Sequence, residues 1–362
     1  MNTRAIRVIA IAAFSALLFA FLPLRSGAAA PRPVSQRDTP TYQWGINTLV
    51  SYDCIPEGTW QQWATTQVNA FKALGANSIA IGIPIYTDSW TSNNVYSKLD
   101  CAGGFYTTPP PNLVGDIVTI AHAAGLQVLV RPLLDQASLA PDNRWRGQIE
   151  PTNPKLWFTN YFNALQPYLA MAQQYGVEHF AIATELDSML HFPYWSQVIA
   201  GAKRIYTGDL VFTGLWAPGG EKRYPGTSPG IDTYVGIQHV TPAATPSQLL
   251  AGWNKALKTF DPLPYMSRET IDEVTIPAQT GAYTYPYIFD VPYTRQPFNQ
   301  TIQANWFTMV CRFVKSHHLG GVYFWGPSIF EFQGGLPTAP DKSVSYNIQP
   351  ASQRVLHNCF TT

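Results

Sequence analysis

Eight short apolar segments alternate with helix-like stretches along most of the 362-residue chain, and this alternation limits the possible folds more than any other feature. Short apolar runs bounded by turn residues are typical of buried strands. The expected strands cover residues 42–48, 78–85, 127–134, 179–184, 210–215, 234–239, 264–268 and 321–325. A repeating order of strand and helix predicts an α/β fold, with parallel strands joined by right-handed crossovers.

The stretches between the expected strands have the length and composition of helices. They cover residues 59–74, 113–124, 154–175, 193–206, 246–259 and 302–318. A glycine often stands where a helix gives way to the next strand, as at Gly75, Gly125, Gly176 and Gly320. Glycine is the residue expected just past a helix C-terminus, so these positions support the proposed order.

Two α/β architectures are compatible with this order, a doubly wound open sheet and a closed barrel. The open sheet usually has a glycine-rich phosphate turn after an early strand, but here residues 49–53 read LVSYD. Eight strand candidates in one repeating order favour a single (β/α)8 TIM barrel over residues 41–362. Residues 86–111, 135–153 and 271–300 are then expected as long loops at the strand ends, the face that builds the active site of a barrel.

The first 30 residues have the features of a secretory signal peptide. Arg4 and Arg7 precede an apolar run over residues 8–22, and small residues fill positions 26–30. A membrane anchor is the alternative, but this run is shorter than the ~20 residues needed to span a bilayer. Residues 31–40 are polar and proline-rich and are expected to form a flexible lead-in. We therefore expect a secreted protein, extracellular or in the cell envelope, with no membrane insertion after cleavage.

Charge and aromatic content narrow the possible partners. Without the three arginines of the leader, the formal charge of +1 becomes −2, and only 12% of residues are charged. Such a chain has no electrostatic footprint for nucleic acid or anionic lipid. Aromatic residues make up 14%, with 11 Trp and 19 Tyr, and they suit a cleft that stacks on the apolar faces of sugars, although barrels also bury many aromatics. Composition alone only leans toward a sugar partner. The expectation of an oligosaccharide or polysaccharide, bound by a monomer without a cofactor, depends on the acidic residues described below.

Four cysteines, an even number in an exported chain, suggest two disulfides. Three connectivities are possible, and we favour Cys54–Cys101 and Cys311–Cys359. The first pair would join the loops after the first two strands, and the second would join the C-terminal segment to the last helices. Metal binding is not expected, because no two cysteines have the C-x₂₋₄-C spacing of a zinc site.

Three acidic residues directly follow apolar strand candidates, namely Asp135, Glu185 and Glu269. Burying an unpaired carboxylate is costly, so an acid at such a position needs a reason. For any one of them, capping of the next helix is a sufficient explanation. Two glutamates at the ends of strands four and seven are a sharper indication, because those strands lie across the rim of an eight-stranded barrel.

Paired carboxylates about 5–5.5 Å apart are the catalytic arrangement of retaining glycosidases. Strand alternation points Tyr265, Ser267 and Glu269 the same way, toward the barrel mouth. Asp272 and Glu273 follow closely and are alternatives, but we expect them in the loop beyond the strand. The sequence therefore predicts Glu185 and Glu269 as the pair.

Several short segments in a characteristic order carry a family resemblance. They are WRG at 145–147 before a helix with WF at 157–158, YGVE at 175–178, FAIATEL at 180–186, Trp306, and GVYFW at 321–325. In this order the chain resembles the retaining barrel glycosidases of clan A. Within that clan it is most similar to the family-113 glycoside hydrolases, whose characterised members are β-mannanases.

The resemblance implies a role for each matching residue. Glu185 would be the general acid/base, with a raised pKa, and Glu269 the ionised nucleophile. Arg131 and Arg268 are candidates for keeping that nucleophile charged. Trp325 would form the platform beneath the sugar, or else a core aromatic at the barrel mouth.

Other residues are expected around the substrate. His239, at the end of the sixth strand, would hydrogen-bond the nucleophile or a sugar hydroxyl, unless it is structural. Asn47, Trp145 and Arg146 would line the cleft. Thr184 stands where most clan-A enzymes carry the asparagine that binds the sugar 2-hydroxyl, and this departure bears on the identity of the substrate.

The alternatives are a barrel that only binds glycan, a hydrolase of another class, and a glycoside hydrolase that acts on another sugar. A barrel that only binds glycan would be expected to lack one of the two glutamates. No H-E-x-x-H pair appears in the sequence, which argues against that class of zinc protease. A β-glucan, a galactan or an arabinan remains an alternative substrate, and transglycosylation an alternative outcome. The sequence thus favours a retaining glycoside hydrolase without deciding the sugar.

Overall fold

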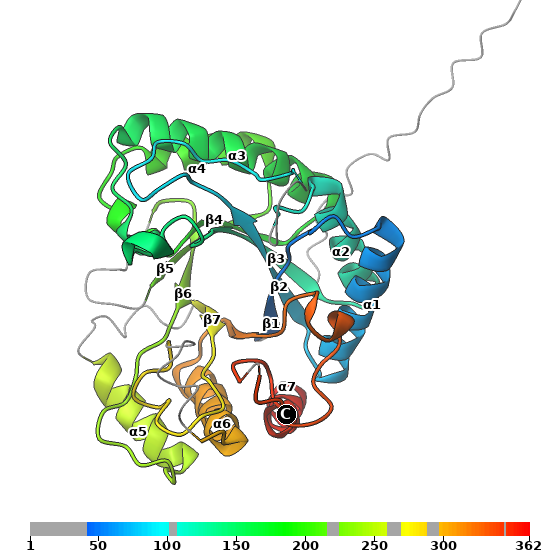
Figure 1. The fold of residues 1–362 in the computed structure, drawn as a ribbon, viewed down its shortest axis with the longest axis vertical. Helices are drawn as coiled ribbons and strands as arrows, with labels where there is room; N and C mark the ends of the chain where they lie inside the picture. Colours follow the sequence, from blue (N-terminus) through cyan, green and yellow to red (C-terminus); the bar gives the residue numbers. More distant parts are fainter. Residues whose placement is uncertain (1–41, 101–106, 216–223, 259–268, 288–296, 344) are drawn as a thin grey trace, which may run out of the picture.

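Eight strands pair in parallel, each with the next along the chain and the last with the first, which closes the sheet into a barrel (Figure 1). The computed structural model describes residues 42–100, 107–215, 224–258, 269–287, 297–343 and 345–362. The strands are β1 Gln43–Leu49, β2 Ser78–Ile85, β3 Gln127–Leu134, β4 His179–Thr184, β5 Asp209–Leu215, β6 Ser228–Asp232, β7 Thr270–Val274 and β8 Gly321–Trp325. The prediction of a single (β/α)8 barrel is confirmed.

Helices surround the barrel on its outer side (Figure 1). The α-helices within the described residues are α1 Glu57–Ala73, α2 Pro111–Ala123, α3 Pro154–Tyr175, α4 Trp195–Ile205, α5 Pro246–Leu257, α6 Gln300–His317 and α7 Pro350–Thr361. Short 3₁₀ turns are η1 Ala140–Asp142, η2 Arg146–Gln148, η3 Asp187–Met189 and η5 Glu331–Gly334. The 3₁₀ turns all lie in segments that follow a strand, so they belong to the loops of the barrel mouth.

Most strand predictions agree with the structure, and two do not. The predicted bounds of β2, β3, β4 and β8 are confirmed. The expected sixth strand at 234–239 is wrong, because β6 ends at Asp232 and those residues form a loop and turn. The expected seventh strand at 264–268 lies outside the described residues, and β7 follows it in the chain. Both errors misplace the carboxyl-terminal end of a strand, and with it the residue expected at the site.

The core has two parts, one between the helices and the barrel and one inside the barrel. Large side chains fill the outer part, where Trp60, Trp157, Trp195, Trp253 and Trp306 are fully buried. A smaller cluster fills the barrel, formed by Ala80, Leu129, Ala181, Val211 and Tyr323. Tyr323 fits there because Gly45 has no side chain, since a Cβ at Gly45 would lie 2.1 Å from its ring. Much of the aromatic content therefore serves packing rather than sugar binding.

Two strands carry an extra residue relative to a neighbour. In β4, Ala181 and Ala183 pair with consecutive residues of β5. In β7, Ile271 and Glu273 pair with consecutive residues of β6, and a shift also occurs against β8. An extra residue of this kind re-aims side chains, and such bulges occur often beside active sites. Regular alternation therefore fails at the two strands that lead to the candidate carboxylates.

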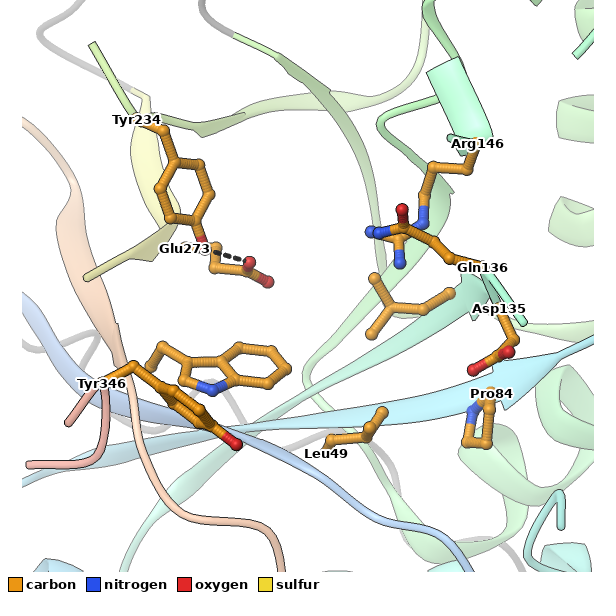
Figure 2. Close-up of a pocket in the computed structure, with 10 residues that line it drawn as sticks. Leu49, Pro84, Asp135, Gln136, Arg146, Tyr234, Glu273 and Tyr346 are labelled. Carbon is orange, nitrogen blue, oxygen red and sulfur yellow. Dashed lines mark hydrogen bonds between the residues drawn. The ribbon is translucent and has the colours of Figure 1, made fainter. Parts of the chain in front are cut away.

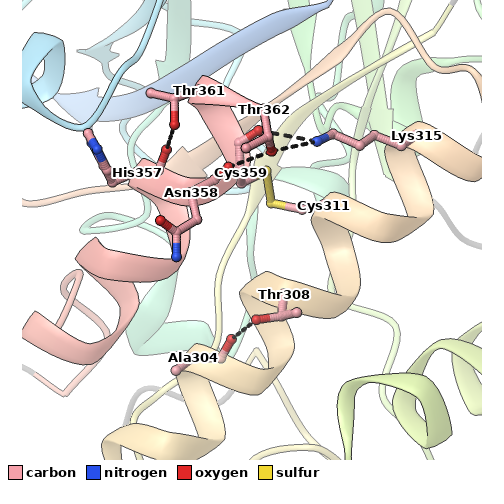
Figure 3. The surroundings of a disulfide bond; sticks show 9 residues. All are labelled: Ala304, Thr308, Cys311, Lys315, His357, Asn358, Cys359, Thr361 and Thr362. Atoms are coloured by element: carbon pink, nitrogen blue, oxygen red, sulfur yellow. Dashed lines mark hydrogen bonds between the residues drawn. A yellow bond between two sulfur atoms is a disulfide. The ribbon is translucent and has the colours of Figure 1, made fainter.

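The Cys311–Cys359 disulfide joins α6 to α7 (Figure 3). On the same helix pair, Lys315 Nζ donates to the backbone oxygen of Cys359 and to the hydroxyl of Thr362. The same C-terminal end of α7, at Phe360 and Thr361, lies against Gly75, just after α1. This disulfide prediction is confirmed, whereas Cys54–Cys101 involves a residue outside the described part. The predicted leader and lead-in also lie outside it.

Candidate active site

A pocket of about 390 Å³ opens at the carboxyl-terminal ends of the strands (Figure 2). Its wall combines carboxyl, guanidinium and aromatic groups with a few apolar side chains. The lining residues are Leu49, Pro84, Leu133, Asp135, Gln136, Arg146, Tyr234, Glu273, Trp325 and Tyr346. This is the face on which barrel enzymes build their active sites.

Glu273, at the penultimate position of β7, is held from three directions. Its Oε2 accepts hydrogen bonds from Nδ2 of Asn47 and from NH1 of Arg131, each at 3.0 Å. Its Oε1 accepts one from the hydroxyl of Tyr234 at 2.5 Å (Figure 2). The side chain is almost fully buried, yet it lines the pocket. Two neutral donors and one cation together fix the orientation of this carboxylate.

Glu269 does not reach this pocket. The prediction that it ends the seventh strand is wrong, because it directly precedes β7. Its backbone oxygen accepts a hydrogen bond from the amide of Gly320, which in turn directly precedes β8. Glu269 therefore lies at the amino-terminal end of the barrel, opposite the mouth. The glutamate near the carboxyl-terminal end of β7 is Glu273.

Glu185 follows β4 directly and is bound by Arg146. NH1 of Arg146 lies 2.8 Å from Oε2 of Glu185. The backbone at Glu185 has a φ of 51°, in the left-handed region that side chains rarely adopt. Such strain concentrates at functional sites, where the surrounding structure over-determines it.

The electrostatics connect Glu185 with Glu273. Burial raises the pKa of Glu185, Arg146 lowers it, and the negative charge of Glu273 raises it again. Arg146, which binds Glu185, lines the same pocket as Glu273. Glu185 therefore lies beside the pocket that Glu273 lines, and the two carboxyl groups have different surroundings.

Beneath the pocket lies a fully buried cluster of charges. Arg131 pairs with Asp232 at 2.5 Å through NH2, as well as with Glu273. Burial alone would lower the pKa of Arg131, but Asp232 and Glu273 raise it above its ordinary value. Asp272 accepts hydrogen bonds from the hydroxyls of Thr213 and Thr270, both at 2.6 Å. Arg131 is thus a permanent cation that offsets several buried carboxyl groups.

The other predicted site residues divide into two groups. Trp325 and Arg146 line the pocket, and Asn47 and Arg131 contact Glu273. Thr184 is buried, with no hydrogen-bond partner for its hydroxyl, and Trp145 packs its ring against Gly147. Neither of these two lines the pocket.

His239 is exposed in a turn beyond the end of β6. The prediction that it ends the sixth strand is therefore wrong, because the strand stops earlier at Asp232. Tyr234 instead occupies the place beside the carboxylate that His239 was expected to take.

Neither a metal site nor a membrane-spanning helix is found within the described ranges. No group of three or more His, Cys, Asp or Glu side chains there is arranged to hold a metal ion. Within the same ranges, no helix has both the length and the apolar character needed to cross a bilayer.

Sequence reasoning named Asp272 and Glu273 only as alternatives to the preferred Glu269, and it missed Tyr234 and Asp232. The segment 270–276 reads TIDEVTI, in which five of seven residues are β-branched. Residues 264–268, PYMSR, contain none and begin with proline. Strand propensity therefore favoured the later segment. No comparable indication exists for Tyr234, which lies in a loop.

Comparisons with known proteins agree with this geometry. The sequence profile of Glycoside Hydrolase Family 113 matches residues 51–333, and no curated protein matches the sequence. A GH113 β-1,4-mannanase solved as a complex has a TM-score of 0.67 at 16% identity, covering 89% of this chain and 99% of the other. The GH113 β-mannanase of Alicyclobacillus acidocaldarius, in complex with ManMIm, gives 0.64 at 17% identity, covering 88% and 97%.

At these identities the structural likeness shows the fold alone. The family profile, by contrast, spans most of the chain and includes both β4 with Glu185 and β7 with Glu273. The chain therefore belongs to Glycoside Hydrolase Family 113.

Proposed function

We propose that this chain is a retaining glycoside hydrolase of the β-mannanase type, with Glu273 as nucleophile and Glu185 as general acid/base. The observation that carries the proposal is that Glu273 lines the pocket, while Arg146, which lines it too, binds Glu185. Glu273 is held by Asn47, Arg131 and Tyr234, whereas Glu185 is buried with a raised pKa. Two carboxyl groups with contrasting environments are what a double displacement needs.

The reaction takes two steps. First, an oxygen of Glu273 bonds to the anomeric carbon while the glycosidic bond breaks, and the departing oxygen takes the proton of Glu185. Water then attacks the anomeric carbon, Glu185 removes its proton, and the bond to Glu273 breaks. The anomeric configuration is inverted twice and so retained, and both glutamates return to their starting states.

The surroundings assist each role. Arg131, Asn47 and Tyr234 hold Glu273 in one orientation, so little motion is needed before attack. Trp325 ends β8 beside the pocket and offers an apolar ring to a sugar face. Arg131 acts from the buried side and therefore does not compete with substrate for space. These contacts support the assignment of Glu273 in preference to Glu269.

For the substrate, we propose a β-1,4-linked mannan. The support is the family and its two solved neighbours, which are described as β-mannanases. A β-glucan, a galactan and an arabinan are the alternatives to test beside it. The loops that line distant parts of a polysaccharide site vary most among related barrels, so the sugar is best decided by assay.

The test is a product assay on these four polysaccharides with wild type, Glu273→Ala, Glu185→Ala and Glu269→Ala. The first two variants should lose kcat by orders of magnitude, and Glu269→Ala should retain it. Exogenous azide should restore the Glu273→Ala variant with an inverted glycosyl azide, and NMR of early wild-type products should show retention. Full activity in Glu273→Ala would refute the mechanism, and binding without cleavage by wild type would indicate a glycan-binding barrel.

We also propose that the chain is exported and loses residues 1–30. The support is the charged, apolar and small-residue order of that segment together with a disulfide at Cys311–Cys359, since disulfides persist in oxidising compartments. N-terminal sequencing of the protein recovered from the medium or envelope tests this. An intact Met1 on the functional protein would contradict cleavage.

A further inference from the structure

The ion pair between Arg146 and Glu185 joins a loop to the proposed acid/base. The two side chains are only 13% and 8% exposed. Arg146 lies on η2 in the loop after β3, and its Nε donates to the backbone oxygen of Leu134 at 2.8 Å. One edge of the guanidinium is therefore fixed to the end of β3, while NH1 faces the carboxyl group. The cation is held in place rather than free to swing.

A fixed cation on this oxygen is not what a proton donor needs. A general acid must carry its proton when the glycosidic bond breaks, and a neighbouring cation favours the carboxylate instead. Burial raises the pKa of Glu185, and Arg146 lowers it. Two opposing influences thus act on one carboxyl group, and the structure retains both.

The positive charge of Arg146 is useful in the second chemical step, in which Glu185 acts as a base. Once Glu273 is bonded to the sugar, its negative charge is gone, and with it the repulsion that helped Glu185 to keep a proton. Arg146 and Arg131 keep their charge throughout. In the covalent intermediate, the protonation equilibrium of Glu185 therefore shifts toward the carboxylate, which is the form that removes a proton from water.

We infer that Arg146 is a positioning residue that acts through Glu185, fixing its Oε2 and favouring the carboxylate form in which it serves as the base of the hydrolytic step. This inference rests on the proposed role of Glu185 as acid/base. The other charged or titratable groups that influence Glu185, or are influenced by it, are Arg131, Asp187, Asp232, Tyr234 and Glu273. Arg146 binds Glu185 directly, because its NH1 donates to Oε2 of Glu185 at 2.8 Å.

The matched variants are Arg146→Met, which removes the charge at similar size, and Arg146→Lys, which keeps it. Arg144→Met is the control, because it removes a cation from the same loop that stacks on Trp90, 4.4 Å from the ring centroid. Any change due to loop charge in general should appear in Arg144→Met as well.

The first measurement is the pH dependence of kcat/KM on polysaccharide and of kcat on an aryl glycoside whose good leaving group makes the second step limiting. In Arg146→Met, the alkaline limb of kcat/KM should move to higher pH, because Glu185 keeps its proton longer. The acidic limb of kcat should also move to higher pH, because the base forms later. Arg146→Lys and Arg144→Met should keep the wild-type limbs.

The second measurement does not depend on activity. The carboxyl carbon of Glu185 is followed by ¹³C NMR across pH, with its resonance assigned by Glu185→Gln. Its midpoint should be higher in Arg146→Met than in wild type or Arg146→Lys. If Arg146→Met left both the limbs of the pH profiles and the titration midpoint of Glu185 unchanged, the inference would be overturned while the proposed function stayed intact. Full activity in Glu185→Ala would overturn both.

Discussion

The hydroxyl of Tyr234 lies 2.5 Å from Oε1 of Glu273 and donates a hydrogen bond to it, although the tyrosine belongs to the loop after β6. This contact orients the proposed nucleophile from the side of the pocket opposite to Arg146 (Figure 2). A loop residue thus completes a site that the strands only begin.

Tyr234→Phe should therefore reduce kcat/KM while the fold persists. A hydrogen bond to a charged group contributes about 1.5–3 kcal/mol, which corresponds to a loss of about ten- to a hundredfold in rate. Steady-state kinetics on the preferred polysaccharide would measure it. Tyr168→Phe is the control, since Tyr168 donates to the backbone of Pro109 away from the pocket; equal losses in both variants would contradict a specific role.

Arg131→Met should strongly destabilise the protein, because it leaves Asp232 and Glu273 buried without their cation. Breaking one side of a buried ion pair typically costs about 3–5 kcal/mol. Urea unfolding of Arg131→Met, Asp232→Leu and the double variant forms a cycle that measures the coupling. The double variant should be less destabilised than the sum of the single changes. Strictly additive changes would show that the pair does not act as a unit.

Asp187→Asn should change how stability depends on pH. Burial raises the pKa of Asp187 to about 7 from its ordinary value of 3.8, partly opposed by the amide of Leu215 and increased by Glu185. The folded state therefore binds the proton more tightly, so this group's contribution is fully present below about pH 4 and is lost as pH rises through about 7.

Denaturant unfolding at several pH values checks this. Wild type should lose stability between about pH 4 and 8, and Asp187→Asn should lose less of it, since the amide stays neutral. Glu150→Gln, which alters an exposed carboxyl group, should follow wild type. Parallel curves for wild type and Asp187→Asn would contradict the raised pKa.

The double variant Cys311→Ser/Cys359→Ser should unfold at lower temperature than wild type. Removing a disulfide commonly costs about 2–4 kcal/mol, and this one joins α6 to α7 on the outside of the barrel. Calorimetry would record the change, and kcat/KM at 25 °C should stay at the wild-type level because the bond lies far from the pocket. An unchanged melting temperature would show that helix packing alone holds α7.

Much of the fold follows from local sequence. After Ser78, the strand at 78–85 is a continuous apolar run, and the strand at 127–134 is apolar apart from Gln127 and Arg131. Such runs are expected for strands buried on both faces, and the bounds of both agree with the structure. The strand at Ser228–Asp232 was missed because SPGID contains proline and glycine and little that favours a strand. Closure of the barrel gives this strand its pairing partners, although its own sequence does not predict a strand.

The site was harder to predict than the fold. Alternation assumes a regular pleat, but the extra residue in β7 lets Asp272 and Glu273 both turn inward, one to Thr213 and the other to Arg131. The bulge depends on the register against β6 and β8, which the β7 sequence alone does not specify. The position of Glu185 was easier to predict, because it directly follows β4, a strand with correctly predicted bounds.

The pairing of Gln43 with Gly321 has a consequence for how the protein is made. Until the last strand leaves the ribosome, β1 has one unpaired edge, and an open edge of this kind readily accepts a foreign strand. The cylinder therefore closes only after translation has passed Trp325, and contacts between such distant segments form slowly. During nearly all of its synthesis the nascent polypeptide therefore carries a strand edge that is exposed to pairing with foreign strands.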